Sequence, residues 1–305
     1  MLISIVMITY NHEKYIEKAI ESALAQEGKF EIELLIGNDK SPDNTEEILK
    51  KYQNNKKIRI FNREKNLGAT KNLLDLFLKS NGDYIAILEG DDYWVDKRKL
   101  EKQLEILENN KEYSLCYTNS DIIDENSIKI GEKKVTKEKI NNFKALIANS
   151  GEIPTGTVMF RDIFKGNKRI DDIKKLLISG EIIGDLSLFS ILIKYGKFIK
   201  LNEITGAYRY ITDSNISSSY SSKKDVLKKS ELYKVTKGIK EYYKEKSLYI
   251  DLLVVRRKYE LIREIEKLNE DLSKYEVKKD FLLILYKLIK PFHDLSLSYY
   301  KRIYK

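Results

Sequence analysis

Cysteine, proline, histidine and tryptophan are scarce in this sequence of 305 residues, which has one Cys, three Pro, two His and one Trp. The single Cys116 excludes an internal disulfide and a zinc site built on several thiolates. Because it lies in the apolar run 113–117, we expect a buried, structural thiol. Few prolines and 34% charged residues are typical of a soluble globular protein with long helices. A chain of this length commonly holds one large α/β domain with an extension.

Long apolar runs are also absent. No stretch of about 18 apolar residues occurs, which excludes an ordinary transmembrane helix. The apolar segment Leu2–Ile8 has no basic residue before it and leads directly into polar residues, so we expect a first strand and not a signal peptide. We therefore expect a cytoplasmic protein.

The excess of positive charge is confined to one end of the chain. Residues 221–305 contain 22 of the 56 Lys and Arg and 13 of the 47 Asp and Glu, which leaves 34 of each sign in residues 1–220. A neutral core argues against a nucleic-acid partner, because a cleft for nucleic acid would itself be basic. A basic C-terminal extension suggests contact with an anionic surface.

Strand and helix patterns alternate along the first 120 residues. This order predicts an α/β fold with a parallel sheet and helices on both faces, whose ligands bind where the strands end. The predicted strands are 2–9, 32–36, 57–61 and 83–88, and the predicted helices are 13–26, 43–52 and 69–79.

The loops after these strands contain neither a GxGxxG nor a GxxxxGK[ST] motif. A nucleotide bound here therefore needs something other than a glycine-rich loop to neutralise its phosphates. The segment 89–92, Glu-Gly-Asp-Asp, is a candidate, because hard carboxylate oxygens suit a Mg²⁺ or Mn²⁺ ion that bridges a diphosphate. The alternative is a solvated turn in which Asp92 caps the following helix.

Four segments, taken together in order and spacing, resemble the inverting glycosyltransferases of family 2, which have the GT-A fold. They are SIVMITYNHEKYI (4–16), GNDKSPDNT (37–45), NLGATKN (66–72) and GDYIAILEGDDYW (82–94). The likeness covers about residues 1–215 and implies a Rossmann-like, mostly parallel sheet. We expect a catalytic domain over 1–220, with a nucleotide-binding half (1–116) and an acceptor-side half (117–220), and a basic helical extension over 221–305.

The resemblance implies a nucleotide-sugar donor, commonly a UDP-sugar, and assigns residues to it. Asp39 matches the acid that accepts a hydrogen bond from the base; the alternative is a turn residue. Asp43 and Thr45 are expected only to cap a helix. Lys71 falls where a basic residue faces the donor. The residues matched to donor binding are Thr9, Tyr10, Asn11, Glu13, Asp39, Asn66, Gly68, Lys71, Glu89, Gly90 and Arg209.

The same resemblance implies a divalent cation, Mn²⁺ or Mg²⁺, with Asp91 as ligand and Asp92 as a weaker or indirect one. Asp185, in the segment Gly184–Leu188, matches the catalytic base, which takes the proton of the acceptor hydroxyl. The alternative is that Asp185 caps a helix over 186–195. For Arg209 the alternative is a structural salt bridge.

One position departs from the pattern. Ile211 stands where the family often has a histidine that contacts metal or phosphate, and neither His12 nor His293 is placed by the sequence to replace it. We therefore expect a cation held by Asp91, donor phosphates and water, with help from Arg209 or from residues 212–215.

The resemblance implies transfer to a hydroxyl of a glycan or glycolipid acceptor in cell-surface polysaccharide synthesis. A sugar nucleotidyltransferase is the alternative enzyme, although its glycine-rich N-terminal loop is absent. A catalytically degenerate scaffold gains support only from Ile211 and Glu89.

The end of the extension, residues 276–305, mixes apolar and aromatic residues with cations. This composition predicts a helix at the inner face of the cell membrane, bound peripherally. The alternative is a set of helices packed on the catalytic domain or on a second subunit.

Overall fold

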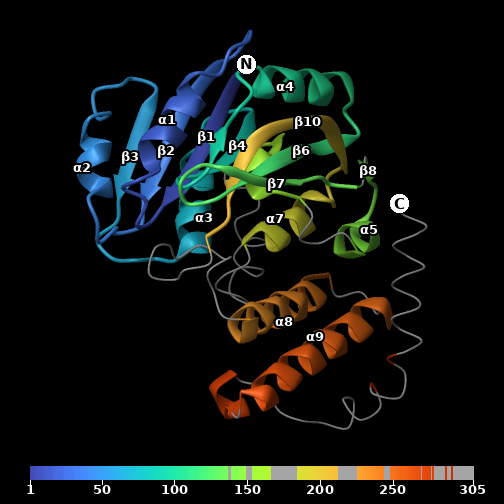
Figure 1. Cartoon of the computed structure of the whole chain (residues 1–305). Coiled ribbons are helices and arrows are strands. Elements are labelled where there is room, and N and C mark those ends of the chain that lie inside the picture. The colour runs from blue at the N-terminus through green and yellow to red at the C-terminus, as the bar shows by residue number, and fades with distance from the viewer. Residues whose placement is uncertain are drawn as a thin grey trace.

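The computed structural model describes residues 1–136, 139–148, 153–165, 184–211, 225–243, 248–268, 270–275, 277, 286 and 290. Its centre is a ten-stranded sheet with the order β3-β2-β1-β4-β9-β6-β10-β5, to which β7 adds beside β6 and β8 beside β10. Helices cover the sheet, and the C-terminal helices lie beyond one of its helical layers (Figure 1).

Residues 1–116, the predicted nucleotide-binding half, contain the consecutive parallel strands of the sheet. Among them, β1 pairs in parallel with β2 on one side and with β4 on the other, and β3 adds in parallel to β2. All four strands therefore end at the same edge, as predicted. Their bounds are β1 Leu2–Thr9, β2 Glu31–Asn38, β3 Ile58–Asn62 and β4 Tyr84–Glu89.

Helices pack on both faces of this half, which confirms the predicted layering. Helices α1, α2 and α4 bury their apolar residues against one face of the sheet, and α3 packs against the other. Every third or fourth residue of α1 is apolar and buried, which is the pattern of a helix with one face in the core. The bounds are α1 Ile16–Leu24, α2 Thr45–Lys50, α3 Ala69–Lys79 and α4 Lys99–Asn109.

The described part of residues 117–220, the predicted acceptor-side half, adds antiparallel strands to the predicted, mostly parallel sheet. The short β9 (Met159–Arg161) runs antiparallel between β4 and β6, while β6 and β10 are parallel to each other. Because β9 runs backwards, the residues that precede it lie at the edge where β4, β6 and β10 end. The other strands are β5 Tyr93–Trp94, β6 Tyr113–Ile123, β7 Lys129–Lys133, β8 Lys139–Ile140 and β10 Lys197–Arg209.

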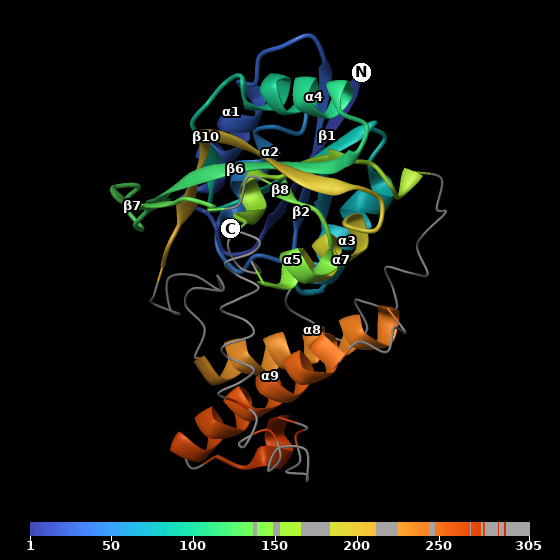
Figure 2. The ribbon, with the colours of Figure 1, turned by 90° about the vertical axis from the view of Figure 1, so that its right-hand side faces the viewer.

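The C-terminal extension is helical over its described residues and packs on the catalytic domain. Buried apolar residues of α8 and α9 belong to the same core cluster as those of α7, and both views place α8 next to the layer of α5 and α7 (Figures 1 and 2). The predicted boundary at residue 220 lies outside the described residues. The bounds are α5 Phe143–Ala148, α7 Gly184–Leu192, α8 Asp225–Tyr243 and α9 Leu248–Lys267.

Most of the segment predicted to bind membrane, 276–305, lies outside the described residues. Two of its described side chains are buried: Val277 joins a small apolar cluster with α9, and the Tyr286 ring lies 5.7 Å from the ring of Tyr259. These two positions pack against protein, as the alternative predicted. Within the residues that the structure describes, no helix is long and apolar enough to span a bilayer.

Candidate active site

The predicted loops meet at the edge where the parallel strands end. Because β1 lies between β2 and β4, the loops that follow these three strands are neighbours. The backbone N–H of Asp39 donates to the carbonyl of Thr9 over 2.9 Å, and that of Gly90 donates to the carbonyl of Ile8 over 2.9 Å. The sheet thus brings the first, second and fourth loops together.

The loop after β1 is fastened to the loop after β2. Asn11 has a positive φ of 63°, which asparagine tolerates better than most residues, and its N–H donates to the Ser41 hydroxyl over 3.1 Å. The Glu13 carboxylate accepts from the backbone and side-chain nitrogens of Asn44, each over 2.9 Å. Asp43 accepts from the backbone of Glu13 and of Thr45, at the start of α2. Glu13 therefore joins the two loops, and its predicted contact with the nucleotide stays a prediction.

Asp39 lies at the centre of the second loop and is 3% exposed. Its two carboxylate oxygens accept from the N–H groups of Leu67 (2.7 Å) and Gly68 (2.9 Å), and the Asn66 side chain also accepts from Gly68. Gly68 has a φ of 81°, which favours glycine. The structure thus brings the predicted Asp39, Asn66 and Gly68 together. Each carboxylate oxygen has a second lone pair, so these bonds leave room for a donor on a base.

The buried amide of Asn72 links the start of α3 to the end of β2 and to Arg63. Asn72 donates to the carbonyl of Gly37 over 2.8 Å and accepts from Arg63 over 3.0 Å. A side chain at position 37 would meet the Asn72 amide at 2.3 Å, so only glycine fits there. The sequence offered no signal for Arg63.

Two further residues that the resemblance assigned to the donor lie near the surface. The predicted Lys71 is exposed at the start of α3, and Tyr10 is half-buried after β1.

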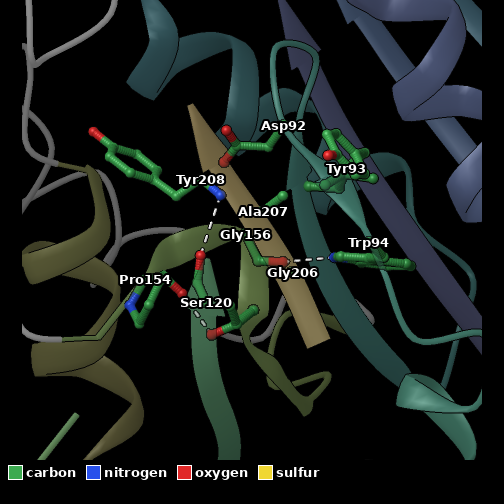
Figure 3. Close-up of a pocket in the computed structure, with 11 residues that line it drawn as sticks. Asp92, Tyr93, Trp94, Ser120, Pro154, Gly156, Gly206, Ala207 and Tyr208 are labelled. Atoms are coloured by element: carbon green, nitrogen blue, oxygen red, sulfur yellow. Dashed lines mark hydrogen bonds between the residues drawn. The ribbon is translucent and has the colours of Figure 1, made fainter. Parts of the chain in front are cut away.

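The acidic segment 89–92 packs against Gly156, which lies just before β9. A Cβ on Gly156 would be 3.1 Å from Oε2 of Glu89 and 3.2 Å from Oδ2 of Asp92. The Trp94 indole donates to the Gly156 carbonyl over 2.7 Å (Figure 3). The pocket at this point is lined by Leu88, Asp92, Tyr93, Trp94, Ser120, Pro154, Gly156, Thr157, Gly206, Ala207 and Tyr208.

Burial and crowding disfavour the ionised carboxylates in this cluster. The pKa of Glu89 is raised to about 8, first by burial and then by the charges of Asp91 and Asp185. The pKa of Asp92 is raised well above its ordinary value by burial and by the charges of Asp91 and Glu89. The repulsion among these carboxylates is reduced either when they bind protons or when they bind a cation.

Asp185 lies in the first turn of α7, beside the same cluster. Burial raises the pKa of its carboxyl, and its charge in turn raises the pKa of Glu89. The carboxylate accepts from the backbone N–H of Leu186 over 2.6 Å. Helix α7 begins at Gly184, so Asp185 is a first-turn residue where we considered a cap. The predicted base and the predicted cation loop are therefore brought together. Lys133 of β7, which the sequence did not single out, lowers the pKa of both carboxyls.

Arg209, the last residue of β10, is buried against the acidic segment 89–92. Its guanidinium donates to the carbonyls of Asp91 (2.8 Å) and Asp124 (2.7 Å) and to the Ser127 hydroxyl (3.0 Å). Its backbone N–H donates to Asp92 over 2.7 Å. Among the residues that the structure describes, the acceptors of the guanidinium are thus uncharged, whereas the alternative that we considered was a salt bridge. A contact with the nucleotide stays a prediction for Arg209. Residues 212–215, the other predicted helpers, lie outside the described residues.

His12 is a site residue that the sequence analysis missed. Its Nε2 lies 3.7 Å from Oδ2 of Asp91, and its Nδ1 lies 3.2 Å from the Thr9 hydroxyl oxygen. The sequence did not place His12 near the acidic segment 89–92, and the structure brings it beside Asp91. The feature that brings His12 to Asp91 is the register of the sheet. Ile8 is paired with Glu89, so the residues just after these two strands are neighbours.

The comparison with known families agrees with this geometry. Residues 4–167 match the sequence profile described as glycosyl transferase family 2. The chain belongs to this family.

Proteins with similar sequences or structures agree with this assignment to family 2. An uncharacterized protein of Mycobacterium tuberculosis is 34% identical over 161 residues, which are 52% of this chain and 46% of that protein. WfgD of Escherichia coli, named UDP-Glc:alpha-D-GlcNAc-diphosphoundecaprenol beta-1,3-glucosyltransferase, is 35% identical over 150 residues, which are 49% of this chain and 56% of WfgD. The matched region thus spans about half the length of these relatives.

The crystal structure of residues 1–349 of TarS from S. aureus in complex with UDP superposes with a TM-score of 0.59. It is 16% identical in sequence and covers 90% of this chain and 77% of the TarS chain. This similarity confirms the GT-A fold.

Whether the site suits a divalent cation can be judged from its donor atoms. In the part of the chain that the structure describes, no group of three or more His, Cys, Asp and Glu side chains is arranged to hold a metal. The protein offers carboxylates crowded enough to raise the pKa of Glu89 and Asp92, and hard oxygen ligands fit Mg²⁺ or Mn²⁺. One Asp92 oxygen already accepts from Arg209, which leaves Asp91 as the main candidate ligand. A diphosphate would supply the remaining ligands.

Proposed function

We propose that this family 2 glycosyltransferase moves a sugar from a UDP-sugar to a hydroxyl of a glycan or lipid-linked glycan, with inversion, in cell-surface polysaccharide synthesis. A uridine donor is supported by TarS, whose structures contain UDP and UDP-GlcNAc. A diphosphate-lipid acceptor is supported by the name of WfgD.

The observation that carries the proposal is the convergence of Asp185 with the acidic segment 89–92. The two come from distant parts of the sequence, yet Oδ2 of Asp185 lies 3.5 Å from the Thr155 hydroxyl oxygen, and the next residue, Gly156, packs against Glu89 and Asp92. One carboxylate on the acceptor side beside a candidate cation site is what inverting transfer requires.

In the proposed reaction, the Asp185 carboxylate takes the proton of the acceptor hydroxyl as that oxygen forms a bond to the anomeric carbon. The bond from this carbon to the diphosphate oxygen breaks on the opposite side, and UDP leaves with the electron pair. A cation held by Asp91 would offset the charge that develops on the leaving group. Asp39 would accept from the uracil N–H and so orient the donor.

Titration calorimetry with UDP tests the donor and cation assignments. Wild-type protein should bind UDP more tightly with Mn²⁺ than with a chelator, and Asp91→Asn should reduce this difference. Asp83→Asn is a matched control, because Asp83 precedes β4 at the opposite edge of the sheet. Equal affinity of the wild type with Mn²⁺ and with chelator would contradict the cation assignment.

Product analysis separates this proposal from the alternatives. A working transferase should release UDP from its UDP-sugar donor in the presence of Mn²⁺. A sugar nucleotidyltransferase would instead release pyrophosphate from UTP and a sugar phosphate, and a scaffold would release neither.

The proposal includes attachment to the inner face of the cell membrane, where a lipid-linked acceptor lies. Its support is the net charge of +9 that falls within residues 221–305, since each cation near an anionic surface contributes about 1 kcal/mol. Sedimentation with anionic liposomes should show binding that weakens at high salt. A variant that ends near Val277 should bind less, and equal binding would assign the segment to packing against protein.

A further inference from the structure

The His12 ring lies between Thr9 and Asp91 and is mostly buried. Nδ1 is 3.2 Å from the Thr9 hydroxyl oxygen, and Nε2 is 3.7 Å from the Asp91 carboxylate. The side chains of His12 and Asp91 are each 10% exposed, so neither is fully enclosed by protein.

The backbone holds His12 in this position. Its N–H donates to the Thr45 hydroxyl over 3.0 Å, and its carbonyl accepts from Tyr15 and Ile16 at the start of α1, each over 2.9 Å. The neighbouring strand leaves space for the ring, because a Cβ on Gly90 would be 2.9 Å from Nδ1 and 2.8 Å from the Thr9 hydroxyl oxygen. A glycine at position 90 therefore permits the contact between Thr9 and His12.

The hydrogen bond at Nδ1 determines what Nε2 presents to Asp91. When Nδ1–H donates to the Thr9 hydroxyl, the lone pair of Nε2 faces a carboxylate, which is unfavourable unless a cation lies between them. Metal-bound histidines usually donate their other N–H in this way, which fixes the tautomer. A separation of 3.7 Å is also too long for a direct hydrogen bond.

We infer that His12 is a nitrogen ligand of the divalent cation and acts together with Asp91. Two adjacent ligands at about 2.1 Å from an octahedral ion are about 3.0 Å apart, so the pair needs to close by less than about 1 Å. The buried Ile211 has no donor atom to offer, and His12 supplies one from the other half of the fold. This inference rests on the proposed cation-dependent binding of UDP.

Electron spin-echo spectroscopy of Mn²⁺ bound to the full chain with UDP tests the inference, because a directly bound imidazole gives a ¹⁴N modulation. The chain has only two histidines, His12 and His293, so the assignment needs only two variants. We expect the modulation in the wild type and in His293→Gln, and its loss in His12→Gln. The affinity for Mn²⁺ in the presence of UDP should fall about 10-fold to 100-fold in His12→Gln and not in His293→Gln.

Wild-type protein labelled with ¹⁵N-histidine makes the test independent of whether His12→Gln folds. The ¹⁴N modulation should be replaced by a ¹⁵N coupling if a histidine is the ligand. Bound Mn²⁺ without a histidine coupling, or a coupling that depends on His293, would overturn the inference and leave the proposed function standing. Failure of Mn²⁺ to bind with UDP at all would overturn both.

Discussion

The Trp94 indole donates a 2.7 Å hydrogen bond to the carbonyl of Gly156, and this bond fixes the residue on which the acidic cluster packs. The buried amine of Lys99 lies 4.3 Å from the centre of the Trp94 ring and donates to Gln103 over 2.7 Å. Burial lowers the pKa of Lys99 to about 7. The Trp94 bond thus holds the backbone of Gly156 next to Glu89 and Asp92.

Gly156→Ala should weaken binding of UDP with Mn²⁺ roughly tenfold, because small displacements of positioned groups are costly. The added methyl would lie 3.1 Å from Glu89 and 3.2 Å from Asp92 and must push them aside. Gly131→Ala is the control, since its methyl would meet only Ile122 at 3.8 Å. Calorimetry checks both variants, and unchanged affinity in Gly156→Ala would show that the cluster does not need this space.

Asp39→Ala should lower both stability and UDP affinity. The carboxylate accepts from Leu67 and Gly68, and loss of two such bonds should cost about 2 kcal/mol of unfolding free energy. Asp162→Ala is matched, because Asp162 also accepts from two backbone N–H groups, at the opposite edge of the sheet. Both variants should melt earlier, but only Asp39→Ala should bind UDP more weakly. Equal UDP affinity in Asp39→Ala and Asp162→Ala would show that Asp39 is a turn residue that does not bind the base.

Asp185→Asn should retain donor binding and lose transfer by a factor of about 10²–10⁴. Asparagine keeps the size of the side chain but cannot take the proton. In the wild type, the rate should fall as pH decreases through the pKa of Asp185, which burial raises above its ordinary value. Asp225→Asn, in the first turn of α8, is the control for a change of charge at a helix start. Comparable turnover of Asp185→Asn and wild type would place the base elsewhere.

Stability without a cation should fall as pH rises from about 5 to 8, and Glu89→Gln should reduce this fall. The pKa of Glu89 is about 8 in the folded chain against 4.5 when unperturbed. Between these values the folded state binds more protons than the unfolded state, so raising the pH favours unfolding. The wild type should therefore lose more stability over this range than the variant, by an amount on the order of a few kcal/mol. Melting curves at several pH values check this. Parallel curves would mean that Glu89 is ionised at neutral pH.

The nucleotide-binding half could be predicted from the sequence because its signals are local. Strand β1 and helix α3 have the bounds that periodicity gave, and the meeting of Asp39 with Asn66 and Gly68 follows from the order of parallel strands. The antiparallel β9 could not be predicted in this way. Three residues, Met159–Arg161, are too short for a periodic pattern, and their direction is set by pairing with distant strands.

The remaining site residues depend on contacts that no local pattern encodes. His12 approaches Asp91 only through the register of β1 with β4. Arg209 meets the carbonyl of Asp91 because β10 and β4 end at the same edge. Lys133 influences Glu89 from a strand at the periphery of the sheet. Each of these contacts joins segments more than forty residues apart, and pairing across the sheet decides them.

The contacts of Arg209 constrain how members of this family can be recombined. A chimera joined near residue 116 would combine one parent's cation loop with the other parent's β10, so a foreign residue 209 would meet the carbonyl of Asp91 and the carboxylate of Asp92. We therefore expect that the two predicted halves cannot be exchanged at residue 116 without loss of these contacts. An exchange of acceptor specificity must transfer the turn at Asp124 and Ser127 together with Arg209, or leave all three in place.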